Sequence, residues 1–165
     1  MMKYFLFLGL ILATHFAAFA QVELGECDQE KNAKADEQIQ KALKAINTKN
    51  LKMAAIYVGN AMKFQEDNVH AFYLTGEIAI REGNLYQTEA AWAKTLEICA
   101  DYKADLYYFL GIIYMENGKK ALAESCLQTF LTKGDRERGY DKDAKSALNE
   151  MHLKENLTTN PVPFD

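Results

Sequence analysis

Residues 69–98, VHAFYLTGEIAIREGNLYQTEAAWAKTLEI, are followed by a second stretch of similar pattern, residues 104–133, ADLYYFLGIIYMENGKKALAESCLQTFLTK. An aromatic residue, a glycine four positions later and another glycine seven positions beyond it recur at an offset of 35 positions. The two sets are Phe72, Gly76 and Gly83, and Tyr107, Gly111 and Gly118. Each stretch is long enough for two helices joined by a turn at the second glycine. A period in this range predicts stacked helical hairpins, whose exposed surfaces serve binding.

Both stretches place a glycine where the two helices of a hairpin would meet. The missing side chain of Gly76 or Gly111 lets the first helix approach the second closely. We expect Trp92 and Leu127 to lie against these glycines and to fill the space between the helices.

The second stretch carries a larger set of residues at characteristic spacings, namely Tyr107, Leu110, Gly111, Tyr114, Ala123 and Leu127. In this set it resembles the tetratricopeptide repeat family. The first stretch keeps the spacing but has Thr75, Ala79 and Thr88 where the family prefers leucine, tyrosine and alanine. Neither stretch has the proline that usually ends the second helix. The resemblance implies an all-α fold, a helical-hairpin repeat array wound into a right-handed superhelix, which binds protein partners.

The hairpin pattern extends on both sides of the two stretches. We expect repeats at about 35–68, 69–103 and 104–137, a capping helix at about 138–155 and a tail at 156–165. In the first repeat Asn50-Leu51 parallels Asn84-Leu85, although Lys41 stands where an apolar residue is expected, so this repeat is degenerate. The capping helix presents one apolar stripe, formed by Ala144, Ala147, Leu148 and Met151. Two prolines in the tail prevent it from continuing as a helix.

Residues 1–20 have the pattern of a secretory signal peptide. An early Lys3 precedes an apolar run, and the stretch ends in Ala18-Phe19-Ala20. The apolar run is too short to span a membrane, which takes about 20 residues. We therefore expect an exported protein, in a bacterial periplasm or secreted, whose mature chain begins at Gln21 with a flexible arm at 21–34.

Composition and motifs exclude several classes of function. The 165-residue chain has a formal net charge of −4, with 49% hydrophobic and 25% charged residues, as in folded domains. Its mild acidity and scattered positive residues argue against binding to nucleic acid or to anionic membranes. The sequence has no metal-ligand spacing of His, Cys and carboxylates, no nucleophile elbow and no phosphate-binding loop. We expect no enzyme, no cofactor and no metal.

Three cysteines remain after export, which favours disulfides. The repeat register places Cys126 beside Ala91, while Cys99 lies eight positions further along that helix. At about 1.5 Å per residue the separation is roughly 12 Å, beyond the limit of about 7 Å for a bridge. We therefore expect that Cys99 and Cys126 do not pair with each other and that both are small core residues. Cys27 is free to pair, within the chain or with a partner.

In each repeat, one stripe of the first helix does not pack on its own second helix. This stripe comprises Tyr73, Glu77, Ile80 and Arg81 in one repeat, and Tyr108, Ile112, Met115 and Glu116 in the next. In the proteins that the chain resembles, the stripe faces a concave groove where partners bind, with His70 and Asp105 here at its rim. Such a groove suits an amphipathic helix or an extended segment of a partner. Alternatively, the three apolar members pack between adjacent first helices. The two tyrosines are harder to place in a core, because their polar ends need water or a partner.

Two functions fit these features. The first is an exported protein–protein interaction module, an adaptor or assembly factor that uses its concave groove. The second is a structural protein of the cell envelope, or one that binds a small apolar ligand or a glycan. A third possibility is the repeat part of a larger envelope complex without a separate activity.

Overall fold

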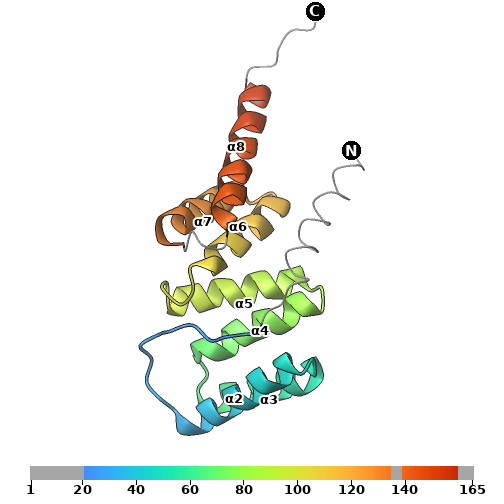
Figure 1. Ribbon diagram of the computed structural model, residues 1–165, viewed down its shortest axis with the longest axis vertical. Coiled ribbons are helices and arrows are strands. Elements are labelled where there is room, and N and C mark those ends of the chain that lie inside the picture. The colour runs from blue at the N-terminus through green and yellow to red at the C-terminus, as the bar shows by residue number, and fades with distance from the viewer. Residues whose placement is uncertain (1–20, 135–138, 160–165) are drawn as a thin grey trace, which may run out of the picture.

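The computed structural model describes residues 21–134 and 139–159, and side chains up to His152. These ranges form seven helices and no strand, in a tetratricopeptide-like all-α array. The helices are α2 (Ala33–Asn47), α3 (Leu51–Phe64), α4 (Val69–Arg81), α5 (Leu85–Ile98), α6 (Asp105–Glu116), α7 (Lys120–Lys133) and α8 (Tyr140–Thr159). Figure 1 shows three hairpins stacked along the long axis: α2–α3 first, α4–α5 second and α6–α7 third, with α8 at the far end. The predicted fold class is confirmed.

The hairpins begin and turn in a repeated way. Asparagine side chains cap the N-termini of α2, α3, α4 and α5 by accepting backbone N–H bonds, and these caps are Asn32, Asn50, Asn68 and Asn84. The turn between the two helices of each hairpin needs a left-handed residue. Gly83 and Gly118 supply it with φ values of 75° and 71°, and Lys49 adopts φ 61° at the corresponding place in the first hairpin. The turn of the first hairpin therefore keeps this geometry without its glycine.

Glycines set the closeness of the two helices in the second and third hairpins. A Cβ atom on Gly76 would overlap the indole ring of Trp92, and one on Gly111 would lie 2.7 Å from Cγ of Leu127. Trp92 and Leu127 are both fully buried. The predicted role of these two glycine contacts is confirmed, because the neighbouring helix occupies the space where a side chain would be.

Helix α8 covers the end of the array. Its apolar stripe, Ala144, Ala147, Leu148 and Met151, is buried as expected, and the helix packs mainly on α7. The helix runs to Thr159, four residues beyond its expected end. Proline disfavours helical backbone at the residue before it, and the first proline after this helix is at position 161, so the sequence permits helix through residues 156–159.

Residues 21–32, the N-terminal segment, form no helix. Figure 1 shows this segment, in blue, running past α4 before the chain enters α2. The predicted signal peptide, residues 1–20, lies outside the described residues. Within the described ranges, no helix is both long and apolar enough to cross a membrane.

Candidate partner-binding groove

The first helices of the hairpins carry the predicted stripe. Its two tyrosines lie at equivalent positions of α4 and α6, and the side chains of Tyr73 and Tyr108 are each only 5% exposed. Glu77 is also buried, at 8%. Buried polar groups need hydrogen-bond partners, and here the chain itself supplies groups that cover this face. We call the surface of α2, α4 and α6, together with the loop before α6, the inner face.

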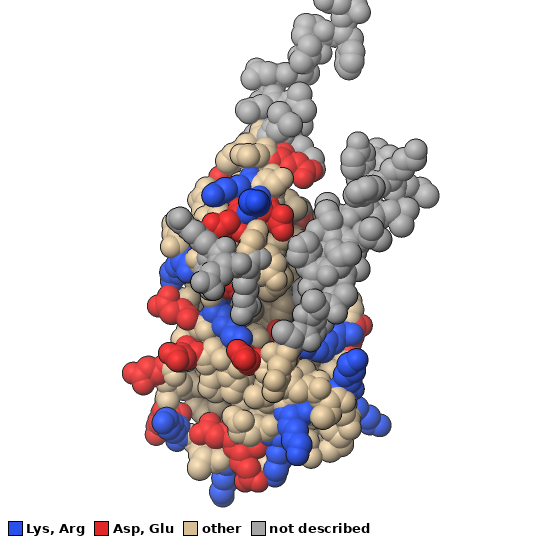
Figure 2. Space-filling view, in the orientation of Figure 1, with Lys and Arg blue, Asp and Glu red and all other residues tan. Residues whose placement is uncertain are grey.

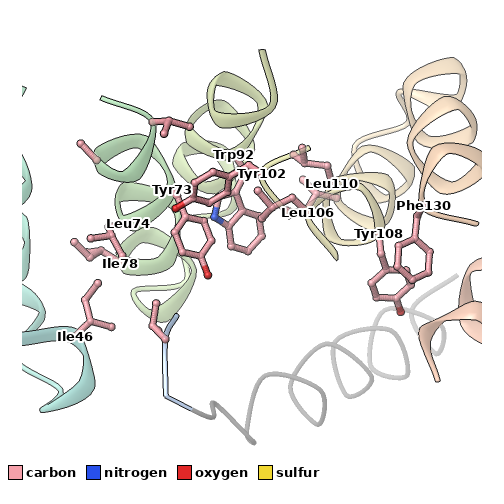
Figure 3. Packing of buried hydrophobic residues seen from close by; sticks show 14 of the residues in the cluster. Ile46, Tyr73, Leu74, Ile78, Trp92, Tyr102, Leu106, Tyr108, Leu110 and Phe130 are labelled. Carbon is pink, nitrogen blue, oxygen red and sulfur yellow. The ribbon is translucent and has the colours of Figure 1, made fainter. Parts of the chain in front are cut away.

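Tyr73 belongs to a polar cluster that the loop before α6 completes. The ammonium of Lys103 lies 5.0 Å from the centroid of the Tyr73 ring and donates to its hydroxyl at 3.4 Å. The Tyr102 ring lies 5.1 Å from the Tyr73 ring, centroid to centroid (Figure 3). Burial raises the pKa of the Tyr73 phenol, and the neighbouring Glu77 carboxylate raises it further. The phenol therefore stays protonated and acts as a hydrogen-bond donor.

Glu77 is the buried acidic group of this cluster. Arg81 donates to its carboxylate at 2.8 Å, one helical turn along α4. Burial raises the pKa of Glu77, while the charge of Arg81 and a hydrogen bond from Arg81 oppose that increase. The two charged residues of the α4 stripe therefore pair with each other, with side chains only 10% and 14% exposed.

Tyr108 lies in an aromatic cluster instead. Its ring stacks on Tyr140 at 4.7 Å with an interplanar angle of 10°, and it lies 5.4 Å from the Phe130 ring. Figure 3 shows Tyr108 and Phe130 side by side at the end of the array. Burial, together with the negative charge of Asp143, raises the pKa of Tyr108 to about 12. The start of α8 therefore covers this part of the inner face.

The other stripe residues divide between core and surface. Ile80, Ile112 and Met115 are half-buried and pack against the hydrophobic core. Glu116 is exposed at the end of α6. At the expected rim, His70 is half-buried and its Nδ1 lies 2.8 Å from the Tyr102 hydroxyl; Asp105 is also half-buried.

The N-terminal segment covers the inner face beside Tyr73. The backbone N–H of Val22 donates to Oδ1 of Asn47 at 2.9 Å. Lys103 donates to the carbonyl oxygen of Glu23, and Gly25 lies directly against Tyr102. The sequence predicted a flexible arm at 21–34, whereas the structure holds residues 22–25 through contacts that reach up to 80 positions along the chain.

The same segment is anchored again before α2 begins. Gln29 accepts from the backbone N–H of Val69 at 3.1 Å and donates to the carbonyl of Asp67 at 2.7 Å. Gln65 donates to the carbonyl of Glu30 at 3.0 Å, and Asn32 donates to the carbonyl of Phe64 at 2.9 Å. These bonds fasten the segment to the loop between the first and second hairpins.

A disulfide joins Cys27 to Cys99, with their Cα atoms 6.2 Å apart. Cys99 and Cys126 are not bridged, as expected, and Cys126 is free and half-buried. Burial raises the pKa of the Cys126 thiol to about 11, which keeps it protonated and unreactive. Cys27 therefore pairs within the chain, one of the two alternatives expected for it, and Cys99 is a half-buried disulfide partner where a small core residue was expected. Cys99 follows the last residue of α5, where its side chain reaches the N-terminal segment.

Sequence reasoning missed Tyr102, Lys103 and the N-terminal segment as parts of the inner face. The segment carries one signal that was available: Val22 and Leu24 alternate with polar residues, and this alternation is typical of an extended stretch with one buried side. Tyr102 and Lys103 lie between hairpins, outside both helical stripes, so a helical period does not detect them.

A recess lies on the side of α4 that faces away from the inner face. It is an open groove of about 460 Å³ between α3 and α5, with α4 as its floor. Small and apolar residues line much of it, among them Ala55, Gly59, Phe72, Ile78 and Ala90. Its shape admits a small apolar group.

Charge and metal ligands add little to either surface. Figure 2 shows acidic and basic side chains interspersed over the face in view, without a continuous patch of one sign. In residues 21–134 and 139–159, no group of three or more His, Cys, Asp or Glu side chains could hold a metal ion.

Comparison with solved structures identifies the fold. No family model and no curated protein matches the sequence. The type III secretion chaperone SycD of Yersinia enterocolitica, solved with a peptide of the translocator YopD, matches with TM-score 0.60 and 12% identity, over 76% of this chain and 97% of that one. The MamA protein matches with TM-score 0.55 and 12% identity over 79% of each chain.

A larger protein contains a similar array. An O-GlcNAc transferase mutant of Thermobaculum terrenum matches with TM-score 0.58 and 16% identity, over 73% of this chain but only 23% of that one. These neighbours are helical repeat proteins of tetratricopeptide type. At such low identity the likeness establishes the fold alone.

Proposed function

We propose that this chain is an exported protein–protein interaction module, an adaptor or assembly factor that binds an extended segment of a protein partner on its inner face. One observation carries the proposal. The inner face already holds an extended stretch of polypeptide, residues 22–25, through a backbone N–H, a backbone carbonyl and the contact of Gly25 with Tyr102. A surface that binds main-chain groups can accept an extended peptide from another chain.

Two features support export. The chain has a Cys27–Cys99 disulfide. Disulfides persist in oxidising compartments and are rare in cytosolic proteins. Residues 1–20 have the pattern of a signal peptide, with small residues at its end. Cleavage after Ala20 would leave Gln21 as a free N-terminus only one residue before the buried Val22.

The structural neighbours support a protein partner. The SycD structure contains a peptide of the translocator YopD, and the CopN–Scc3 complex, with TM-score 0.54 and 13% identity over 86% of this chain, is a protein complex. Arrays of this shape present a continuous surface to their partners.

Co-purification tests the proposal. The mature chain, beginning at Gln21 and with its disulfide intact, is used to capture proteins from its own source, and a defined partner is expected at a fixed stoichiometry. A photo-crosslinking residue at Gln40, which is exposed on α2 beside Leu24, should link to that partner. The matched control carries the same residue at Ala121, which is exposed on α7. Absence of a stoichiometric partner, or crosslinking only from position 121, would reject the proposal.

The recess between α3 and α5 favours a second candidate function, the binding of a small apolar ligand. Its volume of about 460 Å³ is within the range of ligand pockets, roughly 300–1,000 Å³. Native mass spectrometry of protein from its own source would reveal a retained small molecule. Ala90→Leu, which fills the recess, should then abolish that retention and leave capture of a protein partner unchanged.

A further inference from the structure

The N-terminal segment binds the inner face in an alternating pattern. Val22 is buried and Leu24 is half-buried against the core, whereas Glu23 and Glu26 are exposed. Alternate side chains of an extended strand point to opposite sides, so one side of the segment faces the protein and the other faces water. The face therefore selects an apolar residue at two positions and accepts any residue between them.

Main-chain atoms supply the polar contacts between these positions. Asn47 accepts from the backbone N–H of Val22, and Lys103 donates to the backbone carbonyl of Glu23. Neither contact involves the side chain of the bound segment. Another polypeptide with the same spacing would make both contacts equally well.

Gly25 adds a strict requirement. A Cβ atom at this position would overlap the carbonyl oxygen of Tyr102 and approach Cδ1 of its ring to 2.9 Å. A carbonyl of the main chain cannot swing away as a flexible side chain can. The inner face therefore excludes every residue except glycine one position after the second apolar residue.

Residues 22–25 lie on the N-terminal side of the disulfide. The Cys27–Cys99 bond and the contacts of Gln29 hold the rest of the segment, so residues 22–25 can leave the face without releasing residues 27–32. Their departure would uncover Tyr73 and Lys103 and would leave the Lys103 ammonium without the Glu23 carbonyl. The apolar surface that Val22 and Leu24 cover would then be exposed to water, which favours its occupation by a second extended segment.

From these contacts, and given the proposed function, we infer the partner class and its regulation. The inner face binds a partner segment of the form apolar, any residue, apolar, glycine, and residues 22–25 of the chain occupy this face as a tethered competitor. A tethered segment competes at an effective concentration of about 1 mM. Partner binding therefore increases when residues 22–25 are displaced.

The test uses the full mature chain with its disulfide intact. Gly25→Ala prevents residues 22–25 from lying on Tyr102, and Gly59→Ala is the matched control, since a Cβ atom there meets nothing within 4 Å. The probe is a labelled peptide, Gln-Val-Glu-Leu-Gly-Glu, with blocked ends, followed by fluorescence anisotropy. The Gly25→Ala chain should bind the probe at least about tenfold more tightly than the parent or the control chain, because the tethered competitor is removed. The same peptide with alanine in place of glycine should not bind.

A second variant guards against a folding defect. Val22→Asp places a charge in a buried position and should displace residues 22–25 from the inner face, although Gly25 itself is unchanged. Circular dichroism of both variants should match the parent. Equal probe binding by parent and by both folded variants would overturn the inference, as would binding of the alanine peptide or exchange of segments between two copies, detected as a dimer by sedimentation. If the probe fails while a partner still co-purifies, only this inference falls and the proposed function stands.

Discussion

Tyr73 and Tyr108 occupy the same position in two successive repeats and are equally buried, yet different parts of the chain cover them. Tyr73 lies under an extended segment that comes from the N-terminus, among Glu77 and Lys103. Tyr108 lies under the first turn of α8, stacked on Tyr140. One end of the inner face is thus closed by polar and main-chain contacts, and the other by aromatic rings.

The difference indicates at which end a partner could replace the segment that covers the inner face. At the Tyr108 end, helix α8 itself supplies the stacking ring, Tyr140, so that this contact needs no partner protein. A buried cluster of Glu77, Arg81 and Lys103 depends on each hydrogen bond being present. A binding surface is therefore expected at the Tyr73 end, and a structural closure at the Tyr108 end.

Removal of the disulfide should lower stability more than any other change considered, and its effect should be confined to the Tyr73 end. Cys27 and Cys99 are 72 positions apart, and the chain-entropy model assigns such a loop about 4 kcal/mol of stability. In the double variant Cys27→Ser, Cys99→Ser, the free energy of unfolding measured in urea should fall by a large part of this amount. Cys126→Ser is the control and should change stability by less than about 1 kcal/mol. A stable double variant would show that the segment is not fixed by the bond.

Glycine replacement compares the second and third hairpins directly. Gly76→Ala should cost about 2 kcal/mol because the new methyl group meets the rigid indole of Trp92. Gly111→Ala should cost about 1 kcal/mol, since Leu127 can change rotamer to make room. Thermal unfolding of the two variants, with Gly59→Ala as the unconstrained helical glycine, gives the ranking. The reverse order would contradict the packing described for Trp92.

Removal of the hydroxyl group should reduce stability more at Tyr73 than at Tyr108. Tyr73→Phe removes a hydrogen-bonding partner of Lys103 and Glu77 in a buried cluster and should cost about 1–2 kcal/mol. Tyr108→Phe keeps the stacked ring and should change stability by no more than about 0.5 kcal/mol. Equal losses in chemical denaturation would mean that the two ends are closed in the same way.

The smallest expected effect is a dependence on pH at the Tyr73 end. Burial lowers the pKa of His70, although the charge of Asp36 opposes the shift, so folding favours the neutral imidazole. Its contribution to stability is present above the unfolded pKa of about 6.5 and is lost as the pH falls below that value towards the folded pKa. His70→Gln should flatten the stability profile between about pH 7 and 5, measured by urea titration. An unchanged slope would assign the pH dependence to other groups.

The sequence predicted the parts of the molecule that repeat. Gly76, Gly111 and their partners Trp92 and Leu127 follow from spacing, because helix packing at a fixed period requires them. The stripes of α4 and α6 follow from the same period, although their tyrosines prove to be buried.

The covering of the inner face was not predictable in the same way. The contacts of Val22 and Glu23 join residues 25 and 80 positions apart through main-chain atoms, which leave no period in the sequence. Three cysteines likewise allow several pairings, and only the position of Cys99 just beyond the end of α5 decides between them.

The N-terminal segment also alters how the array should unfold. In a linear array each hairpin contacts only its neighbours, so the ends can fray independently of the middle. Here one stretch of chain bonds to the end of α2, to the first turn of α4 and to the loop before α6, and Cys27 links it covalently to the residue that follows α5. The first two hairpins are thereby joined into one unit that should unfold cooperatively. The third hairpin and α8 extend from this unit, with local stability of their own.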